Sequence, residues 1–370
     1  MKFRWLWRES EAEMKFKETF IKILIPIVSI LLAFVIGGIL IACLGKNPIQ
    51  AYGFLLNGAF GSAQKFAQTL TLSCPLIFTS LSAAVAYKCG VFNLGGEGQF
   101  IMGAIGSLYF CEKTGVTGLG GVLLSFLVGL AVGGIWGAIP GLLKILRGLN
   151  EMIVSIMLNY VALYLMGYVY TDLLREGSTP QTMQVDDSLK LMRFSTDFKV
   201  HWGVFLGIIL AFVLAYVIYR TSFGFQLRAV GMNKVASRIS GFPVKRLILY
   251  SFIISGAVAG LGGSVELHGK QYRLMSGFGS GFGFTGVAIA LIAQLNPIGA
   301  MAVAIIFGIM QKGASSLQTG MKIPTSVVDI IQALVIIFAV AGTVLIRKPE
   351  IRQLFSKIGS GKGKEKEASA

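Results

Sequence analysis

The sequence predicts an all-α, polytopic membrane protein with about ten transmembrane helices. Two observations support this. First, 54% of the 370 residues are hydrophobic, the mean hydropathy is +0.73, and long charge-free runs recur along the chain. Second, only 14% of the residues are charged, against about 25% in an ordinary soluble domain. Because a soluble fold of this length cannot bury so much apolar surface, the excess must face lipid. A cytosolic enzyme, a secreted disulfide scaffold and a disordered chain are therefore excluded.

Most of the charge-free runs are long enough to cross a bilayer alone, which takes about 20 apolar residues. The run 98–111 is shorter and follows a polar interruption. The run 274–311 is too long for one crossing, and Asn296-Pro297 supplies a turn signal inside it, so it predicts two short spans. The other seven of the ten expected spans are 23–45, 66–87, 114–143, 152–171, 200–219, 247–265 and 326–346.

The basic residues predict the orientation of the spans. An even number of spans places both termini on one side. If that side is inside, the inner segments hold 22 of the 33 Lys and Arg residues. The positive-inside rule therefore predicts N-in and C-in, and it accounts for the net charge of +16 without a nucleic-acid partner. The outward-facing segments are then 46–65, 112–118, 172–199, 266–283 and 312–325.

The expected domain organisation follows from this orientation. A cytosolic basic N-terminus (1–22) precedes a transmembrane domain (23–346), and a cytosolic basic tail (347–370) follows it. The transmembrane domain carries a cytosolic loop at 220–246 and an extracellular loop at 172–199.

The first apolar run poses a question of processing. Leu40–Cys43 resembles a lipoprotein cleavage box. The apolar run before it is longer than the about 7–15 residues of a signal peptide, and the segment ahead of that run holds four Glu. We therefore expect a retained first span.

Motifs typical of an enzyme or a cofactor site are missing from the sequence. It has no G-x-x-x-x-G-K-[ST] loop for ATP and no H-E-x-x-H zinc motif. Gly281–Gly286 matches G-x-G-x-x-G, but no strand precedes it, so the match is attributed to chance. His201 and His268 lack a nearby partner, and the four cysteines show no paired spacing. We expect neither an enzyme nor a metal or cofactor site in this chain.

Regularly spaced glycines predict close helix packing. Glycines that recur every fourth residue lie on one face of a helix and let a second backbone approach. Packing is favoured over general glycine richness, although it identifies no substrate. The residues concerned are Gly129, Gly133, Gly137 and Gly141 in one span, and Gly256 and Gly260 in another.

The stretch Tyr87–Gln99 would break a helix, since it places glycines and polar residues between two spans. Broken backbone at membrane depth is tolerated when it is buried in protein or lines a cavity. One interpretation is a translocation pathway lined by Phe92, Asn93, Glu97 and Gln99, with a half-helix pointing its amides into it. The other is that Asn93 and Glu97 only cap the next helix.

Gly277–Gly286 has a similar pattern and also precedes a short span. Two glycine-interrupted short segments in corresponding halves are typical of transporters built from repeats. The sequence thus predicts two pseudo-repeated halves with a broken short helix in each.

The cytosolic loop Arg220–Arg246 holds six basic residues and no acidic one. Asn233 is expected to cap a short helix over Lys234–Ser240, which Gly241 and Pro243 end. Two interpretations remain. The loop either docks a cytosolic partner, or it only fixes topology and touches anionic lipid.

These stretches together resemble one family. Gly90–Gln99 resembles the G-L-F-N-I-G-x-E-G-Q signature of ATP-binding cassette (ABC) importer permeases in the ribose and branched-chain amino acid superfamily, nucleoside and simple-sugar branch. Asn150–Ala162 resembles that branch's N-E-V-I-V-T-I-M-L-N-Y segment. Arg228–Asn233, followed by Ala236 and Gly241, resembles its R-A-V-G-x-N…A…G coupling loop. The resemblance covers about residues 20–347, with Gly96 where Ala is frequent and Ser155 in place of Thr.

The resemblance implies a permease subunit of a bacterial cell membrane that imports nucleosides or a related simple sugar by alternating access. It implies a separate cytosolic ATPase that binds the ATP, a second permease that is a distinct paralogue, and an extracellular substrate-binding lipoprotein. The implied pathway residues are Phe92, Asn93, Glu97, Gln99, Asn150, Asn159 and Phe284. The implied ATPase-coupling residues are Arg228, Gly231, Met232, Asn233, Ala236, Arg238 and Gly241.

An ion-coupled secondary transporter of a small polar solute is the alternative. Its support is three carboxylates at or near span ends, Glu97, Glu266 and Asp329, because intramembrane acids often mark ion pathways. Interfacial caps explain the same three residues equally well.

Overall fold

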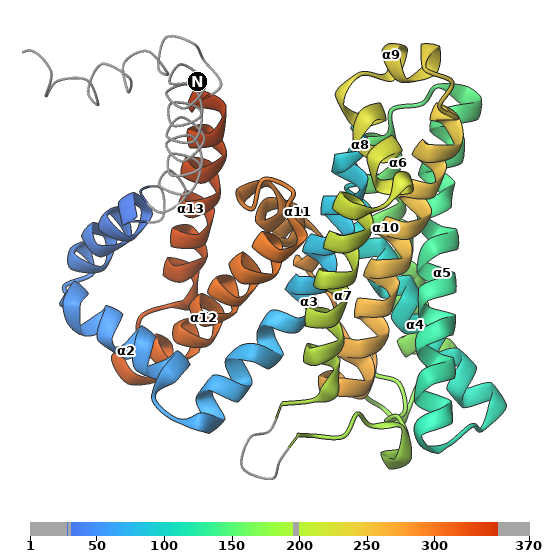
Figure 1. Cartoon of the computed structure of the whole chain (residues 1–370). Helices are drawn as coiled ribbons and strands as arrows, with labels where there is room; N and C mark the ends of the chain where they lie inside the picture. The colour runs from blue at the N-terminus through green and yellow to red at the C-terminus, as the bar shows by residue number, and fades with distance from the viewer. Residues whose placement is uncertain (1–27, 29–30, 195–199, 347–370) are drawn as a thin grey trace, which may run out of the picture. The chain divides into compact units, whose positions relative to one another are not determined.

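The computed structural model describes residues 28, 31–194 and 200–346, and every regular element within them is a helix (Figure 1). Seven of these helices are long and apolar enough to cross a membrane. The pair Leu31–Cys43 and Pro48–Phe60, bent by 116°, brings the number to as many as eight if it forms one span. The all-helical, polytopic fold class is thereby confirmed. The predicted termini 1–22 and 347–370 lie outside the described residues.

The chain divides into two compact units. The smaller comprises Met1–Tyr52 and Ile323–Ala370 and contains α13 (Thr325–Ile346). In it, the Tyr52 hydroxyl donates to the carbonyl of Phe34, and a Cβ added at Gly37 would lie 2.5 Å from the side chain of Ile331. The smaller unit also holds the helix Leu31–Cys43 and the start of α2 (Pro48–Phe60), and the larger unit, Gly53–Lys322, holds the other described helices.

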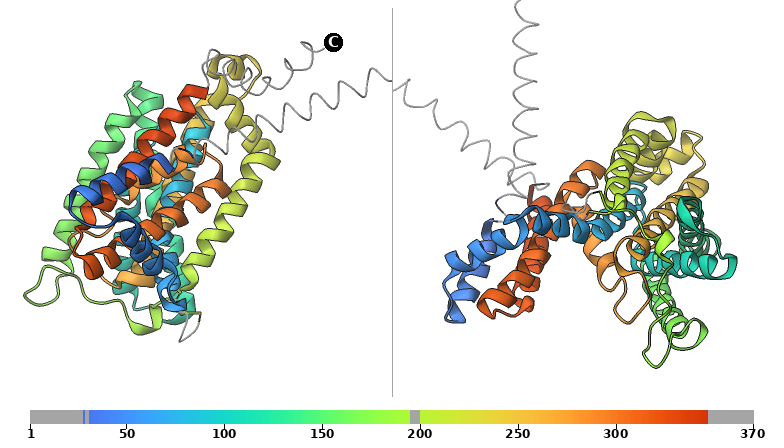
Figure 2. Two further views of the ribbon diagram at one scale, coloured as in Figure 1. Left: turned by 90° about the vertical axis from the view of Figure 1, so that its left-hand side faces the viewer. Right: turned by 90° about the horizontal axis from the view of Figure 1, so that it is seen from below.

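Two helices form the centre of the larger unit. In the apolar windows of α3 and α10, 83% and 72% of the residues are buried, against 28–39% in the other spans. α10 packs against α5, α4 and α3, while α3 also packs against α12, α11 and α7 (Figures 1 and 2). The helices are α3 (Ala63–Lys88), α4 (Gly96–Thr114), α5 (Gly118–Arg147), α6 (Glu151–Tyr168), α7 (Trp202–Arg220), α8 (Ser222–Met232), α9 (Lys234–Ile239), α10 (Val244–Glu266), α11 (Phe282–Ile292) and α12 (Pro297–Met321).

The glycine spacing correctly predicted a close helix contact, which forms between α5 and α10. A Cβ added at Gly133 would lie 2.5 Å from the carbonyl oxygen of Gly256 and 2.6 Å from the Cα of Gly260. A Cβ added at Gly260 would lie 2.3 Å from the carbonyl oxygen of Gly129. The two backbones therefore touch where side chains are absent, as the glycine spacing predicts.

Three predicted segments differ from the structure in their bounds. Asn296, predicted only as part of a turn, caps α12 and accepts from the N–H groups of Ile298 and Gly299 at 3.0 and 3.4 Å. The two helices around it are unequal, however, with 11 residues in α11 and 25 in α12. The segment 312–325, expected outside the spans, is therefore helical to Met321, because a single Lys312 ends a charge-free run without ending a helix. Segment 46–65 likewise contains α2.

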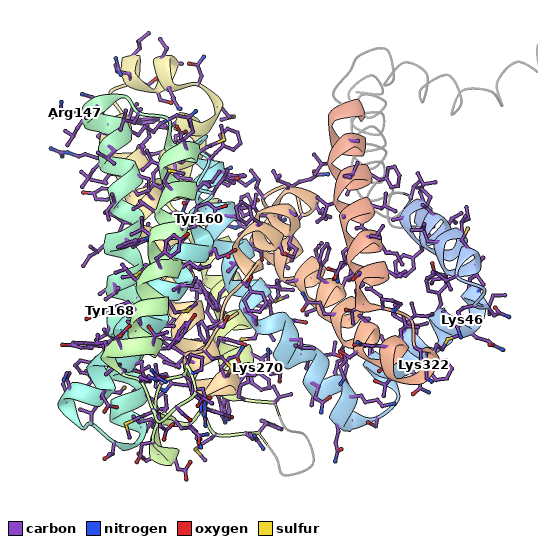
Figure 3. All side chains as sticks on the ribbon, turned by 180° about the vertical axis from the view of Figure 1, so that it is seen from behind. Lys46, Arg147, Tyr160, Tyr168, Lys270 and Lys322 are labelled. Atoms are coloured by element: carbon purple, nitrogen blue, oxygen red, sulfur yellow. The ribbon has the colours of Figure 1, made fainter. Side chains whose placement is uncertain are left out.

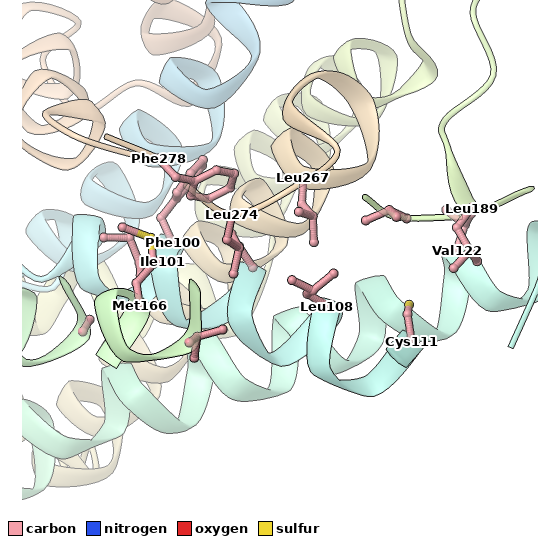
Figure 4. Close-up of a cluster of buried hydrophobic side chains, with 14 residues drawn as sticks. Phe100, Ile101, Leu108, Cys111, Val122, Met166, Leu189, Leu267, Leu274 and Phe278 are labelled. Atoms are coloured by element: carbon pink, nitrogen blue, oxygen red, sulfur yellow. The ribbon is translucent and has the colours of Figure 1, made fainter. Parts of the chain in front are cut away.

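An apolar cluster ties the loops that follow α6 and α10 to the bundle. Two short π-helical turns, Val169–Leu173 and Leu267–Gln271, extend α6 and α10 into these loops. Side chains from α4, α5, α6 and both loops meet in this cluster (Figure 4). Its labelled members are Phe100, Ile101, Leu108, Cys111, Val122, Met166, Leu189, Leu267, Leu274 and Phe278.

Candidate functional site

The predicted break in the backbone lies between α3 and α4. α3 ends at Lys88, and Gly90 turns the chain with a φ of +69°. The segment from there to Gly95 is not helical, although Val91 and Asn93 are almost completely buried. Irregular backbone of this kind persists at membrane depth only when protein groups satisfy its polar atoms. The surroundings of this segment supply such groups.

Asn93 is the centre of that polar network. Its amide nitrogen donates to Oε1 of Gln99 at 3.0 Å and to Oγ of Ser255 at 2.8 Å. Its carbonyl oxygen accepts from the N–H of Gly95 at 2.9 Å and from Nε2 of Gln99 at 3.1 Å. Ser255 in turn donates to the carbonyl of Ser82 at 2.8 Å. The broken segment is thus joined to α3, α4 and α10 at one point.

The start of α4 is capped by another helix. The N-cap residue Gly95 makes no side-chain cap, and the N–H of Gly98 instead donates to Oδ1 of Asn159 on α6 at 2.8 Å. Nδ2 of Asn159 donates to the carbonyl of Leu94 at 2.9 Å. The interpretation in which Asn93 and Glu97 only cap this helix does not account for these contacts, because Asn159 supplies the cap at Gly98 from α6.

The two glycine-interrupted stretches meet at Glu97. One carboxylate oxygen of Glu97 accepts from the N–H of Gly281 at 3.1 Å, and Gly281 is the N-cap of α11. A Cβ added at Gly283 would lie 2.4 Å from the backbone nitrogen of Glu97. The N-termini of α4 and α11 thus converge on one buried carboxylate. Both helix dipoles present their positive ends to this carboxylate, which offsets part of the cost of burying a charge there.

The remaining predicted pathway residues lie apart from this network. Phe92 and Phe284 are each about half exposed. Asn150 is the exposed N-cap of α6, where it accepts from the N–H of Met152 at 2.9 Å. Ser82 and Ser255 joined the network without having been predicted, because an isolated serine in an apolar run gives no signal.

The loop 220–246, predicted to be cytosolic, forms the short helix expected from its sequence. Oδ1 of Asn233 accepts from the N–H groups of Val235 and Ala236, both at 3.0 Å, and α9 follows. Gly241 then takes a φ of +81°. Figure 1 shows α9 at one end of the larger unit. Three apolar side chains here are exposed: Met232 at the end of α8 at 82%, and Val235 and Ile239 on α9 at 70% and 83%.

The end of α8 touches the beginning of the broken segment. A Cβ added at Gly231 would lie 2.1 Å from the carbonyl oxygen of Lys88, and one at Gly90 would lie 3.0 Å from the Cα of Gly231. The backbone at the end of α8 is thus in direct contact with the turn that leads to Asn93.

The predicted coupling arginines differ in their surroundings. The guanidinium of Arg228 lies over the ring of Tyr219, 5.5 Å from its centroid, and its Nε donates to the carbonyl of Gly224 at 3.4 Å. Arg238, in contrast, is exposed on α9. Arg228 is therefore engaged within its own chain, whereas Arg238 is available to a partner.

The carboxylates of the ion-coupled alternative each have a distinct setting. Glu266 on α10 is buried and pairs with Lys270 at 3.0 Å. Asp329 is exposed on α13. In the part of the chain that the structure describes, no group of three His, Cys, Asp or Glu is placed to hold a metal ion.

Comparisons with known proteins agree with these features. The family model for the branched-chain amino acid transport system permease component matches residues 66–340. The chain is 33% identical to the nucleoside ABC transporter permease protein NupB of Lactococcus lactis over 336 residues. That alignment covers 86% of this chain and 90% of NupB. The chain is 32% identical over 331 residues to the guanosine ABC transporter permease protein NupP of Bacillus subtilis, covering 88% and 94%. It is 29% identical over 327 residues to the glucose ABC transporter permease protein TsgB13 of Haloferax volcanii, covering 85% and 86%.

Proposed function

The chain belongs to the family of branched-chain amino acid transport system permease components, and on that premise we propose that it is the permease subunit of an ABC importer for nucleosides. It is a multi-pass protein of the cell membrane. The assignment of nucleosides as the substrate rests on the similarity, over most of each chain, to two permeases whose names specify a nucleoside and guanosine. A simple sugar is the related candidate, since TsgB13 is named for glucose.

In this proposal, ten spans with both termini inside form two pseudo-repeated halves. The meeting of α4 and α11 at Glu97 supports this arrangement, because each helix starts at a glycine-interrupted segment. A second permease, distinct from this chain, completes the pathway, and an extracellular lipoprotein delivers the substrate.

The chain itself holds no cofactor, and a separate ATPase subunit binds the ATP. The exposed apolar side chains of α9 support this assignment, since they leave an unpaired surface at the end of the bundle where the basic loop lies. Basic residues on the same loop, including the exposed Arg238, add charge for an acidic partner surface.

The power stroke then has a short physical route. Movement of the ATPase shifts α9 and α8, and the Gly231–Gly90 contact passes the displacement to the broken segment. Asn93 and Gln99 carry it into α4 and α10 through their hydrogen bonds. Among the proposed pathway residues, Phe92 and Phe284 are the ones with exposed rings for a solute to touch, whereas Asn93, Gln99 and Asn159 act by holding the broken backbone.

Uptake by the reconstituted complex tests the function. Proteoliposomes with both permeases, the ATPase and the binding protein should accumulate labelled guanosine only when ATP is present. Omission of the ATPase should abolish uptake, and an ionophore that collapses ion gradients should not change it. Uptake that stops with the ionophore and continues without ATP would instead establish the ion-coupled alternative, with Glu97, Glu266 and Asp329 as its candidate residues.

The ATPase contact has its own test. Replacing Val235 and Ile239 by Ser removes apolar surface from α9, so less ATPase should copurify with the permease. Leu119→Ser is the matched control, because Leu119 is also 72% exposed but lies at the opposite end of α5 from the α9 side. Equal recovery of ATPase with both variants would remove α9 from the interface.

A further inference from the structure

Three tyrosines form a stripe along one face of α6. Tyr160, Tyr164 and Tyr168 recur every fourth residue and are 57%, 74% and 56% exposed. None of their hydroxyls bonds to another of the described residues. Figure 3 shows Tyr160 and Tyr168 on this helix. We call these three residues the tyrosine stripe.

The opposite face of α6 is occupied by the bundle. Its buried residues are Glu151, Ser155, Asn159, Ala162 and Met166, which at about 100° per residue lie across the helix from the tyrosines. This buried face carries the cap that Asn159 gives to α4. α6 is therefore positioned firmly by one face, and the stripe is presented on the other.

The depth of the stripe argues against a lipid environment. The span Glu151–Leu173 has 23 residues, so its midpoint lies about 17 Å from either end. Tyr160 is about 13 Å and Tyr164 about 20 Å from the Glu151 end, which places both near the bilayer centre. Tyrosines that face lipid gather instead at the two interfaces, where their hydroxyls reach water. Two unpartnered hydroxyls at the centre indicate a polar surrounding.

We propose that the tyrosine stripe is a wall of the translocation path and that its rings stack against the aromatic base of the transported solute. This inference rests on the proposed nucleoside import and adds the site at which the base of the nucleoside would bind. The rings lie about 6 Å apart along the helix, one turn after another. A base can therefore pass from ring to ring.

The chemistry of stacking suits such a path. An aromatic ring stacks on any base because every base has a π face, so the contact is tolerant of base identity. Each contact is weak, which lets the solute leave as readily as it enters. The hydroxyls remain free for water or for the sugar of the nucleoside.

Transport kinetics test the stacking. Tyr164→Leu should lower guanosine uptake by the reconstituted complex about fivefold to a hundredfold, the range that loss of one base–aromatic contact predicts. Tyr164→Phe keeps the ring and should stay within about twofold of the unaltered protein. Leu165→Ala is the control, since Leu165 is 40% exposed on the same helix but about 100° away from Tyr164. Equal rates for Tyr164→Leu and Leu165→Ala would overturn the proposal.

Thiol labelling tests separately whether the stripe faces water. In a Cys43→Ser background, Tyr164→Cys should react with a charged, membrane-impermeant maleimide, and guanosine should slow that reaction. Leu127→Cys, at an exposed apolar position on α5, should react far more slowly. Equal labelling of the two cysteine variants would assign the stripe to lipid. A disulfide from Tyr164→Cys to the second permease that forms irrespective of guanosine would assign the stripe to a subunit contact.

The two experiments separate this inference from the function on which it rests. If the unaltered complex accumulates no nucleoside, the proposed substrate is wrong and base stacking is wrong with it, whatever the labelling shows. If it accumulates guanosine and the Tyr164→Leu rate is unchanged, the function stands and the stripe alone is refuted.

Discussion

The contact between α5 and α10 differs in kind from the contacts that surround Asn93, although both lie in the interior of the larger unit. α5 and α10 meet backbone to backbone at Gly133, Gly256 and Gly260, where no side chain intervenes. The broken segment before α4 is instead held by side-chain hydrogen bonds from Asn93, Gln99 and Asn159. Glycine contacts resist change by steric exclusion and leave no alternative arrangement. Hydrogen bonds can exchange partners, which suits a region that must move during transport.

The largest effect is expected where the two backbones touch. Gly133→Leu would place a side chain where even a Cβ is only 2.5 Å from the Gly256 carbonyl, so α5 and α10 must separate. Overpacking of this kind costs about 1–3 kcal/mol, and more where backbones collide. We expect little folded protein, measured as the monodisperse fraction after detergent extraction.

Gly120→Leu is the control for that variant. Gly120 lies on the same helix, and a Cβ added there has no neighbour within 4 Å. Normal recovery is expected. Similar losses from both substitutions would show that leucine itself, and not the α5–α10 contact, is responsible.

A smaller effect is expected in the polar network. Asn93→Ala leaves the N–H of Gly95 and the amide of Gln99 without their partner, and an orphaned buried group costs about 1–3 kcal/mol. Thermal unfolding of the purified protein should show a lower midpoint, and transport should fall as well. Asn150→Ala offers the comparison, because Asn150 is an exposed cap with one bond to Met152. A loss of stability no larger than for Asn150→Ala would contradict the role given to Asn93.

A third variant addresses the link from the cytosolic loop to this network. Gly90→Ala combines a φ of +69° with a Cβ 3.0 Å from the Cα of Gly231. Gly115→Ala is the matched control, because Gly115 has a φ of +61° and an added Cβ there has no neighbour within 4 Å. Both substitutions therefore carry a similar backbone strain of about 1–2 kcal/mol, but only Gly90→Ala disturbs the contact with Gly231. We expect ATP hydrolysis without transport for Gly90→Ala alone. Matching ratios of transport to hydrolysis in the two variants would argue against this route for the power stroke.

The smallest effect at neutral pH is expected at His201, which precedes α7 outside the spans. Neither ring nitrogen has a hydrogen-bond partner among the described residues. Burial, followed by the nearby charges of Lys270 and Arg193, lowers the pKa of His201 to about 4. Because the folded protein then binds fewer protons than the unfolded chain, stability should be complete above the ordinary pKa of 6.5 and decline as the pH falls towards 4.

His201→Asn should remove part of that decline. The decline is measured from thermal unfolding midpoints between about pH 7 and pH 5. One such group changes the free energy of unfolding by up to about 1.4 kcal/mol per pH unit. An unchanged pH dependence would mean that other groups titrate in this window. His201 thus contrasts with Asn93, which is also buried and polar but fully bonded.

Sequence alone determined the features that depend on neighbours along the chain. Apolar runs specified the membrane class and most spans, since lipid exposure requires a continuous apolar segment. Asn233 predicted the helix it caps, because a cap acts on N–H groups two or three residues ahead, and Asn296-Pro297 predicted the division between α11 and α12. Glycine spacing predicted that α5 has a face in close contact with another helix. The composition of the stretch 89–95 predicted that the helical backbone is interrupted there.

Only the tertiary structure decided which parts meet. It made α3 and α10 the central helices, brought Asn159 of α6 to the start of α4, and joined Glu97 to Gly281. It also turned the tyrosine stripe of α6 away from the bundle. The Asn159 and Gly281 contacts join residues 61 and 184 positions apart, and the spacing of residues in one helix carries no information about the face of another.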